Sequence, residues 1–135
     1  IYGVGGMMDY NGHIPSRPIL TYHYIIPHVP PSNNQFIGRT NFREYQAQKK
    51  TWAMLVKAYC KPAPKKPIAH SVVTLAYCFG DNRRRDPDNY SGKMILDGLV
   101  KAGIIEDDSF GKIDLVLRRV DGADKRTEIT VEEIV

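Results

Sequence analysis

The stretch from residue 70 to residue 89, HSVVTLAYCFGDNRRRDPDN, joins an apolar strand to a charged turn. Residues 70–79 are rich in β-branched and aromatic side chains, and both faces of the strand that they predict are apolar. A strand that is apolar on both faces is typical of the centre of a sheet. Gly80 ends this strand, because glycine and the Asp-Asn pair behind it favour a turn. The sequence therefore predicts a sheet built around residues 70–79, with a charged loop at its end.

Periodic patterns on either side of this strand predict the other elements. Alternating apolar and polar residues indicate strands, and apolar residues that recur every three or four positions indicate helices. The predicted strands are 20–26, 70–79, 113–118 and 127–134, and the predicted helices are 42–60 and a second one that begins near 89–91 and ends at 102. This β-α-β-α-β-β order predicts an α+β fold, a single domain with two main helices packed on a mixed sheet.

Short signals mark the expected helix ends. Asn41 and Glu44 are three residues apart, as in a capping box at the start of the first helix. The proline-rich residues 61–67 end that helix, because proline removes a backbone donor and clashes with the preceding turn. We expect Gly103 to form the C-terminal cap of the second helix.

The length of the chain indicates how many domains it forms, and its charge indicates what kind of partner it binds. The 135 residues suit one domain with its own core. We interpret residues 1–18 as a flexible N-terminal extension or as residues introduced for expression, and residues 19–135 as the folded nuclease-like domain. The formal net charge of +4 suits an anionic partner. Basic clusters at 49–66 and 83–85, together with acids at 106–108, favour a metal-dependent enzyme that acts on nucleic acid.

Several protein classes are disfavoured. Two cysteines, Cys60 and Cys78, are too few for a disulfide framework and lack metal-ligand spacing, so we expect reduced, semi-buried thiols in a cytoplasmic protein. No apolar run is long enough to span a bilayer, and no membrane partner is expected. No glycine-rich phosphate loop occurs, and we expect no small-molecule cofactor beyond a metal ion.

Three aspartates form the candidate site. Asp86 and Asp88 flank Pro87, and in an extended segment residues two apart point to the same side, about 6–7 Å from each other. Asp108 lies beyond the second predicted helix, and a strand–helix–strand unit can return it to the same end of the sheet. Carboxylate oxygens select hard cations such as Mg²⁺ and Mn²⁺. The pattern predicts an Mg²⁺ site in which Mn²⁺ can substitute.

Two other interpretations of these acids exist. Asp86, Asp88 and Asp97 match positions 1, 3 and 12 of an EF-hand calcium loop, but the glycine required at position 6 is Ser91, so we reject a calcium loop. The second interpretation is that Asp86 and Asp88 pair with arginines 83–85 on a solvated turn. The Asp-x-Asp spacing alone does not separate that turn from a metal site.

Two separated blocks of sequence carry a family resemblance. The first block is PPSNN at 30–34, directly after the first predicted strand. The second is RRRDPDN at 83–89, continued by Lys93, DGL at 97–99, KAG at 101–103 and DD at 107–108. In this order, over roughly residues 20–135, they resemble the RusA family of Holliday junction resolvases. The resemblance implies a RusA-like fold and a homodimeric, Mg²⁺-dependent endodeoxyribonuclease that resolves four-way DNA junctions by paired symmetric nicks in recombination and repair. It also favours a phage or prophage origin.

The resemblance also assigns roles to single residues. Asp86, Asp88 and Asp108 match the catalytic, metal-binding carboxylates, and Lys93 matches the catalytic lysine. Asp97 would support Lys93 through an i,i+4 pair, although an exposed helical ion pair is the alternative role. Asp107 is a second possible supporting residue. The residues expected to bind DNA are Arg83, Arg84, Arg85, Asn33, Asn34 and Asn89.

The chain departs from the family pattern at one position. Lys93 follows Asp88 by five residues, whereas the family spacing is four. We expect the extra residue to lie in the turn before Lys93, where Gly92 can adopt a conformation that other residues avoid.

Two further functions remain open from the sequence. One is a branched-DNA-binding protein without turnover, and the other is a nuclease for flaps, replication forks or RNA–DNA hybrids. A catalytic motif does not determine which branched shape is bound, so the sequence separates these functions poorly.

Overall fold

The computed structural model describes residues 18–37 and 41–135, which form a single α+β domain. Most of the predicted extension, residues 1–17, lies outside the described residues. The strands are β1 (Thr21–Ile26), β2 (Ser71–Cys78), β3 (Ile113–Arg119) and β4 (Arg126–Glu133), and the helices are α1 (Phe42–Tyr59) and α2 (Lys93–Lys101). Two short 3₁₀ turns, η1 (Asn33–Phe36) and η3 (Pro87–Asn89), complete the fold. The predicted order of elements is confirmed.

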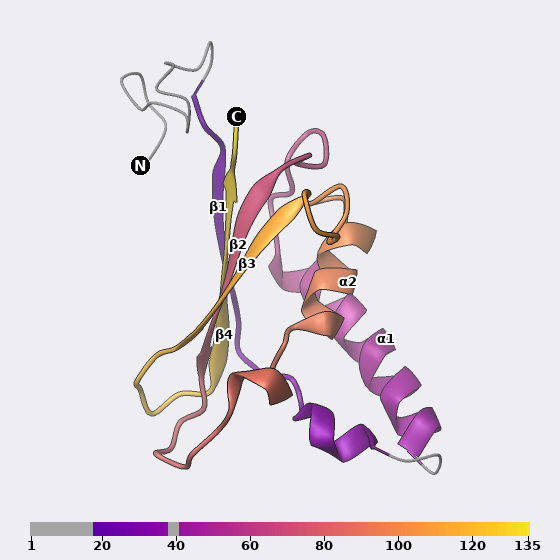
Figure 1. The fold of residues 1–135 in the computed structure, drawn as a ribbon, viewed down its shortest axis with the longest axis vertical. Helices are drawn as coiled ribbons and strands as arrows, with labels where there is room; N and C mark the ends of the chain where they lie inside the picture. Colours follow the sequence, from indigo (N-terminus) through magenta and orange to yellow (C-terminus); the bar gives the residue numbers. More distant parts are fainter. Residues whose placement is uncertain (1–17, 38–40) are drawn as a thin grey trace.

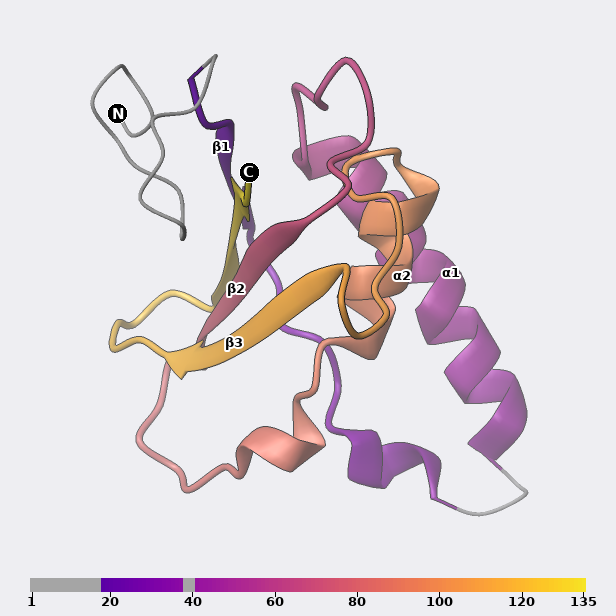
Figure 2. The same cartoon turned by 45° about the horizontal axis from the view of Figure 1, so that its top comes forward.

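The four strands form one mixed sheet in the order β1-β4-β2-β3. β2 pairs in parallel with β3 and antiparallel with β4, while β1 pairs antiparallel with β4. β2 therefore lies inside the sheet, as its two apolar faces predict. Both helices lie on the same face of the sheet (Figures 1 and 2).

The hydrophobic core lies between the sheet and the two helices. Leu75 of β2, Ile129 of β4 and Leu99 of α2 are fully buried. The helices approach each other closely at Gly98 of α2, where a Cβ atom would come within 2.8 Å of Val56 of α1. This close packing fixes α2 against α1. Cys60 and Cys78 are free thiols, as predicted, and both are buried.

One predicted helix start and one predicted helix cap are wrong, whereas α1 begins at residue 42 as predicted. α2 begins at Lys93 and not near 89–91, because Pro87–Asn89 turn as η3 and Gly92 then adopts a left-handed conformation with φ of 82°. Asn41 precedes α1, but its side chain makes no capping bond to the helix. Its amide donates instead to the carbonyl of Ile37, and its own backbone (φ −98°, ψ 5°) is not the extended one that a capping residue adopts.

None of the helices within residues 18–37 and 41–135 is long and apolar enough to cross a bilayer.

Candidate nuclease site

The two sequence blocks meet in space at the end of β2. The side-chain amide of Asn33, in η1, donates to the carbonyl oxygen of Asp88 and to the hydroxyl of Ser91, each over 3.2 Å. Asn33 and Asp88 are 55 residues apart in the chain. The described structure therefore brings the Pro-Pro-Ser-Asn-Asn block against the turn that carries the acidic residues. The Asn33 amide that was predicted to contact DNA holds this turn.

The turn itself differs from the extended segment that was expected. Asp86 is extended (φ −101°, ψ 136°), but Pro87–Asn89 form the 3₁₀ turn η3. Proline suits the first position of a helical turn, because its φ is already fixed and its missing N–H would be unpaired there. The N–H of Asn89 donates to the carbonyl of Asp86 over 3.1 Å. Asp86 and Asp88 are therefore held by a closed turn, and the simple alternation of a strand does not apply to them.

The carboxylates of the site face solvent. Asp86 has a side chain that is 53% exposed and lies 3.4 Å from the Nε atom of Arg84. The Asp88 carboxylate is exposed and makes no hydrogen bond or ion pair within the described part of the chain. In residues 18–37 and 41–135, no three acidic, histidine or cysteine side chains are grouped as a metal site. The assignment of Asp86, Asp88 and Asp108 as metal ligands stays a prediction, although oxygen donors of this kind suit Mg²⁺.

Lys93 opens α2 and pairs with one acidic neighbour, Asp97. Its ammonium lies 3.1 Å from Asp97 one turn along the helix, so the predicted i,i+4 pair is confirmed. The hydrogen bond to Asp97 raises the pKa of Lys93, and the charges of Asp97 and Asp108 raise it further. Asp108 thus acts on Lys93 through its charge. Asp108 precedes β3, and β3 pairs in parallel with β2 so that Ile113 lies beside Ser71; the sheet therefore does not return Asp108 to the end of β2 that Asp86 and Asp88 follow, contrary to what the sequence predicted. The Lys93 side chain is 59% exposed, whereas Asp97 is 18% exposed.

Asp97 also attracts a lysine from the other helix, which the sequence did not indicate. Lys49 of α1 lies 3.6 Å from the second carboxylate oxygen of Asp97. This oxygen is buried and has no hydrogen-bond partner among the described residues. The distance to Lys49 is too long for a strong hydrogen bond but short enough for attraction. Asp97 therefore ties the start of α2 to α1.

The three arginines of the charged loop have different environments. Arg85 is turned inward: it donates to both oxygens of Asp81, and its side chain is 18% exposed. The hydrogen bond from Arg85, and then that from the backbone N–H of Arg83, hold the pKa of the Asp81 carboxyl well below its usual range. Arg84 is 89% exposed. The sequence did not distinguish Arg85 from Arg84, because the partner of Arg85 is fixed only by the fold of the loop.

Phe79 and Arg119 contact the charged loop and stabilise it. The guanidinium of Arg85 lies 4.3 Å from the ring centroid of Phe79, and that of Arg119 lies 5.1 Å from it. Arg119 also donates to the carbonyls of Arg83 (2.7 Å) and Asp81 (2.9 Å). Residues 81–85 are therefore anchored to β3.

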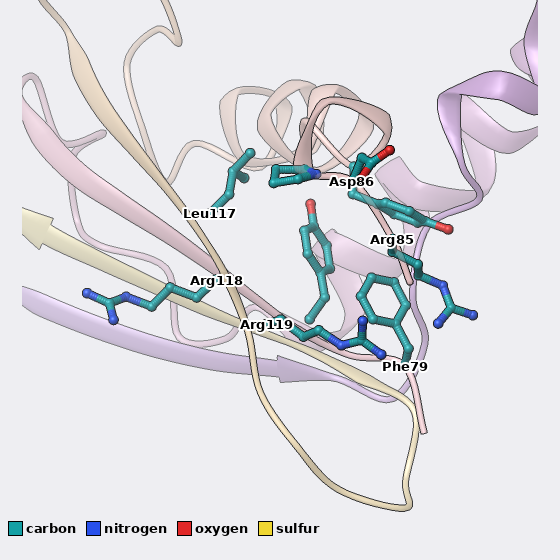
Figure 3. A pocket seen from close by; sticks show the side chains of 9 residues that line it. Phe79, Arg85, Asp86, Leu117, Arg118 and Arg119 are labelled. Carbon is teal, nitrogen blue, oxygen red and sulfur yellow. The ribbon is translucent and has the colours of Figure 1, made fainter. Parts of the chain in front are cut away.

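Two hollows open beside this loop. The first, which we call the polar hollow, has a volume of about 520 Å³, and its lining includes Asn34, Arg83, Arg84, Arg85, Asp86 and Asn89. The second, which we call the aromatic pocket, has a volume of about 80 Å³ and is lined chiefly by Tyr77, Phe79, Arg85, Asp86, Tyr90 and Leu117 (Figure 3). Asn34, Asn89 and the exposed arginines thus gather at one hollow, and their contact with DNA stays a prediction.

The aromatic part of this site is not indicated by the sequence. Alternation along residues 70–79 puts Tyr77 and Phe79 on one face of the predicted strand, but no sequence pattern puts Tyr90 or Arg119 beside them. The chain matches no family model and no curated protein.

Proposed function

We propose that the chain is a RusA-like, Mg²⁺-dependent endonuclease that resolves four-way DNA junctions by paired nicks. One observation carries the proposal: Asn33 joins the two separated blocks by bonding to the turn of Asp88 and Ser91. Chance matches of short motifs have no reason to meet in the fold. Their meeting favours one composite site over two unrelated loops.

The acidic residues of this site suit a hard cation. Asp86 and Asp88 present oxygens to solvent at the end of β2, and Asp108 lies near enough to raise the pKa of Lys93. A bound Mg²⁺ would lower the pKa of an attacking water and stabilise charge on the scissile phosphate. Asp86, Asp88 and Asp108 are the residues that would hold it.

Lys93 has the position of a group that acts on the scissile phosphate. It is exposed at the first turn of α2, and Asp97 fixes its direction. Lys93 is protonated at neutral pH, as lysines ordinarily are, and Asp97 raises its pKa further, so its ammonium can donate a hydrogen bond to a phosphate oxygen. Gly92 adopts a left-handed conformation, and this turn is where the extra residue before Lys93 would be accommodated.

The exposed arginines would bind the DNA backbone. Arg83 and Arg84 face solvent at the polar hollow, where they can approach a phosphate. Arg84 also lies 3.4 Å from Asp86, but its side chain is 89% exposed. Arg85 has a different role, because it is paired with Asp81 and stabilises the loop.

Paired nicks require two active sites related by a two-fold axis, because a four-way junction has that symmetry. We therefore expect a homodimer. Sedimentation at micromolar concentration should give twice the mass of one chain, and a monomer alone would count against junction resolution.

A branched-DNA-binding protein without turnover is the second candidate. Exposed carboxylates beside arginines disfavour it, since acids repel the phosphates that a pure binding protein must hold. Cleavage separates the candidates: a labelled four-way junction is compared with a linear duplex of the same arms, in Mg²⁺ and in EDTA. Paired nicks in the junction alone, lost in EDTA, support a resolvase. Binding of the junction without cleavage in Mg²⁺ and Mn²⁺ supports the binding protein, and cleavage of flaps or forks instead changes the substrate.

A further inference from the structure

The aromatic pocket and the polar hollow are neighbours that share a wall. Arg85, Asp86 and Tyr90 line both of them. Beyond this wall the polar hollow is lined by polar and cationic side chains. The aromatic pocket is lined by aromatic and apolar side chains together with Arg118 and Arg119. A nucleotide has the same division, since it carries a charged phosphate at one end and a flat, largely apolar ring at the other.

The aromatic pocket has firm walls. The rings of Phe79 and Tyr90 meet edge to face, with centroids 4.9 Å apart, and Tyr77 lies 5.9 Å from each of them. In Figure 3 Leu117 lies across the hollow from Asp86 and Arg85, while the Arg118 side chain points away. A volume of about 80 Å³ exceeds what a single water needs, and a flat ring suits such a pocket better than a tetrahedral ion.

We propose that the aromatic pocket binds one unpaired nucleobase of the DNA, with the adjoining phosphate in the polar hollow. This inference rests on the proposed function, because it assumes a DNA substrate. A base must leave its stack to enter, which is least costly where pairing is already interrupted, as at the centre of a branched junction. The shared wall contains Asp86, which is one of the residues that would hold the metal ion. The captured base would therefore lie next to the place where the DNA is cut. The pocket would thereby place the scissile phosphate.

The chemistry of the pocket favours a base over a second phosphate. Nucleobases pack against aromatic side chains irrespective of sequence. The hydroxyl of Tyr77 is buried without a hydrogen-bond partner among the described residues, although its side chain is only 3% exposed. The Tyr77 hydroxyl is protonated at neutral pH, as tyrosines ordinarily are, and burial raises its pKa further, so it can donate a hydrogen bond. A base oxygen or nitrogen that reached it would satisfy a polar group that the described structure leaves unpaired.

The test measures binding in EDTA, where no cleavage occurs. Fluorescence anisotropy compares a labelled thymine decamer with a decamer of abasic deoxyribose phosphates, which has the same charge. Salt is kept identical because phosphate contacts depend on it. One captured base should make the thymine decamer bind on the order of tenfold tighter. Equal affinity for the two, or no measurable binding of either, would overturn the proposal.

A matched pair of variants locates the effect. Leu117→Trp fills the pocket from the edge strand β3, and Leu115→Trp adds the same bulk two residues earlier, where the side chain is 39% exposed. Circular dichroism verifies that both fold. We expect Leu117→Trp to bind both decamers alike and Leu115→Trp to keep the thymine preference. If Leu117→Trp also keeps it, the base binds elsewhere and the proposal fails.

The binding comparison tests the base pocket separately from the nuclease activity. Junction cleavage without a thymine preference would refute the base pocket and leave the nuclease intact. A thymine preference that Leu117→Trp abolishes, in a chain that never cleaves, would support the base pocket and refute the nuclease.

Discussion

Gly92→Ala tests how the start of α2 is fixed. Gly92 has φ of 82°, and a Cβ atom there would lie 2.2 Å from the Cδ1 atom of Leu75. Leu75 is fully buried in the central strand, so it has no room to move aside. The substitution therefore adds both backbone strain and a steric clash.

The two costs can be estimated separately. A left-handed conformation costs a residue with a Cβ about 1–2 kcal/mol, and the lower entropy of the unfolded chain returns about 0.4–1 kcal/mol of this. Overpacking a core costs about 1–3 kcal/mol more. We expect Gly92→Ala to lose roughly 2–4 kcal/mol of unfolding free energy, which lowers Tm by about 6–15 °C for a chain of this size.

Gly111→Ala is the matched control, because Gly111 has φ of 84° and nothing lies within 4 Å of the added Cβ atom. Gly111→Ala should lower the unfolding free energy by only about 1 kcal/mol, because it adds backbone strain without a steric clash. Urea denaturation of both variants gives the difference. Equal losses would show that the contact with Leu75 does not fix the turn, and the reasoning would be wrong.

Three further predictions concern charged side chains. Arg85 lowers the pKa of Asp81, so the stability from this pair is present above about pH 4 and is lost as pH falls through the lower, folded pKa. Thermal melts should therefore show Asp81→Asn below wild type at pH 7, with a gap that narrows as the pH falls below about 4; a gap of the same size at pH 7 and at pH 2 contradicts this. Arg84→Ala should weaken junction binding and reduce the slope of log K against log salt by about one, whereas Arg85→Ala should chiefly lower Tm. Reversed effects would refute the distinction between the two arginines. Lys93→Ala should reduce single-turnover cleavage about 100-fold with little change in junction affinity, and Lys112→Ala, which breaks the pair with Glu106, should not.

The order of elements was predictable because each element carries its own periodicity. β2 was recognisable as a central strand from its two apolar faces, and it lies between β4 and β3. The place of β4 between β1 and β2 was not predictable, since strand order depends on which edges meet and no local pattern encodes it. Leu115 shows the same limit: it alternates like a core residue, but it is 39% exposed because β3 is an edge strand.

The candidate site was predictable where sequence neighbours act together. Lys93 and Asp97 are one helical turn apart, and their pair forms as expected. Contacts between distant segments were not predictable: Lys49 reaches Asp97 from α1, and Arg119 reaches the loop of residues 81–85 from β3. The start of α2 was misplaced because Asn89 still belongs to the 3₁₀ turn and Gly92 is left-handed, so that regular helix begins only at Lys93.

The central claim is that the acidic turn at the end of β2 cuts DNA with the help of Mg²⁺. Its most direct test compares Asp88→Asn with Asp114→Asn, an exposed aspartate at the start of β3, on a labelled four-way junction in Mg²⁺. We predict that Asp114→Asn makes paired nicks at the wild-type rate, while Asp88→Asn binds the junction at least as tightly as wild type and does not cut it. Cleavage by Asp88→Asn at the wild-type rate would contradict the account.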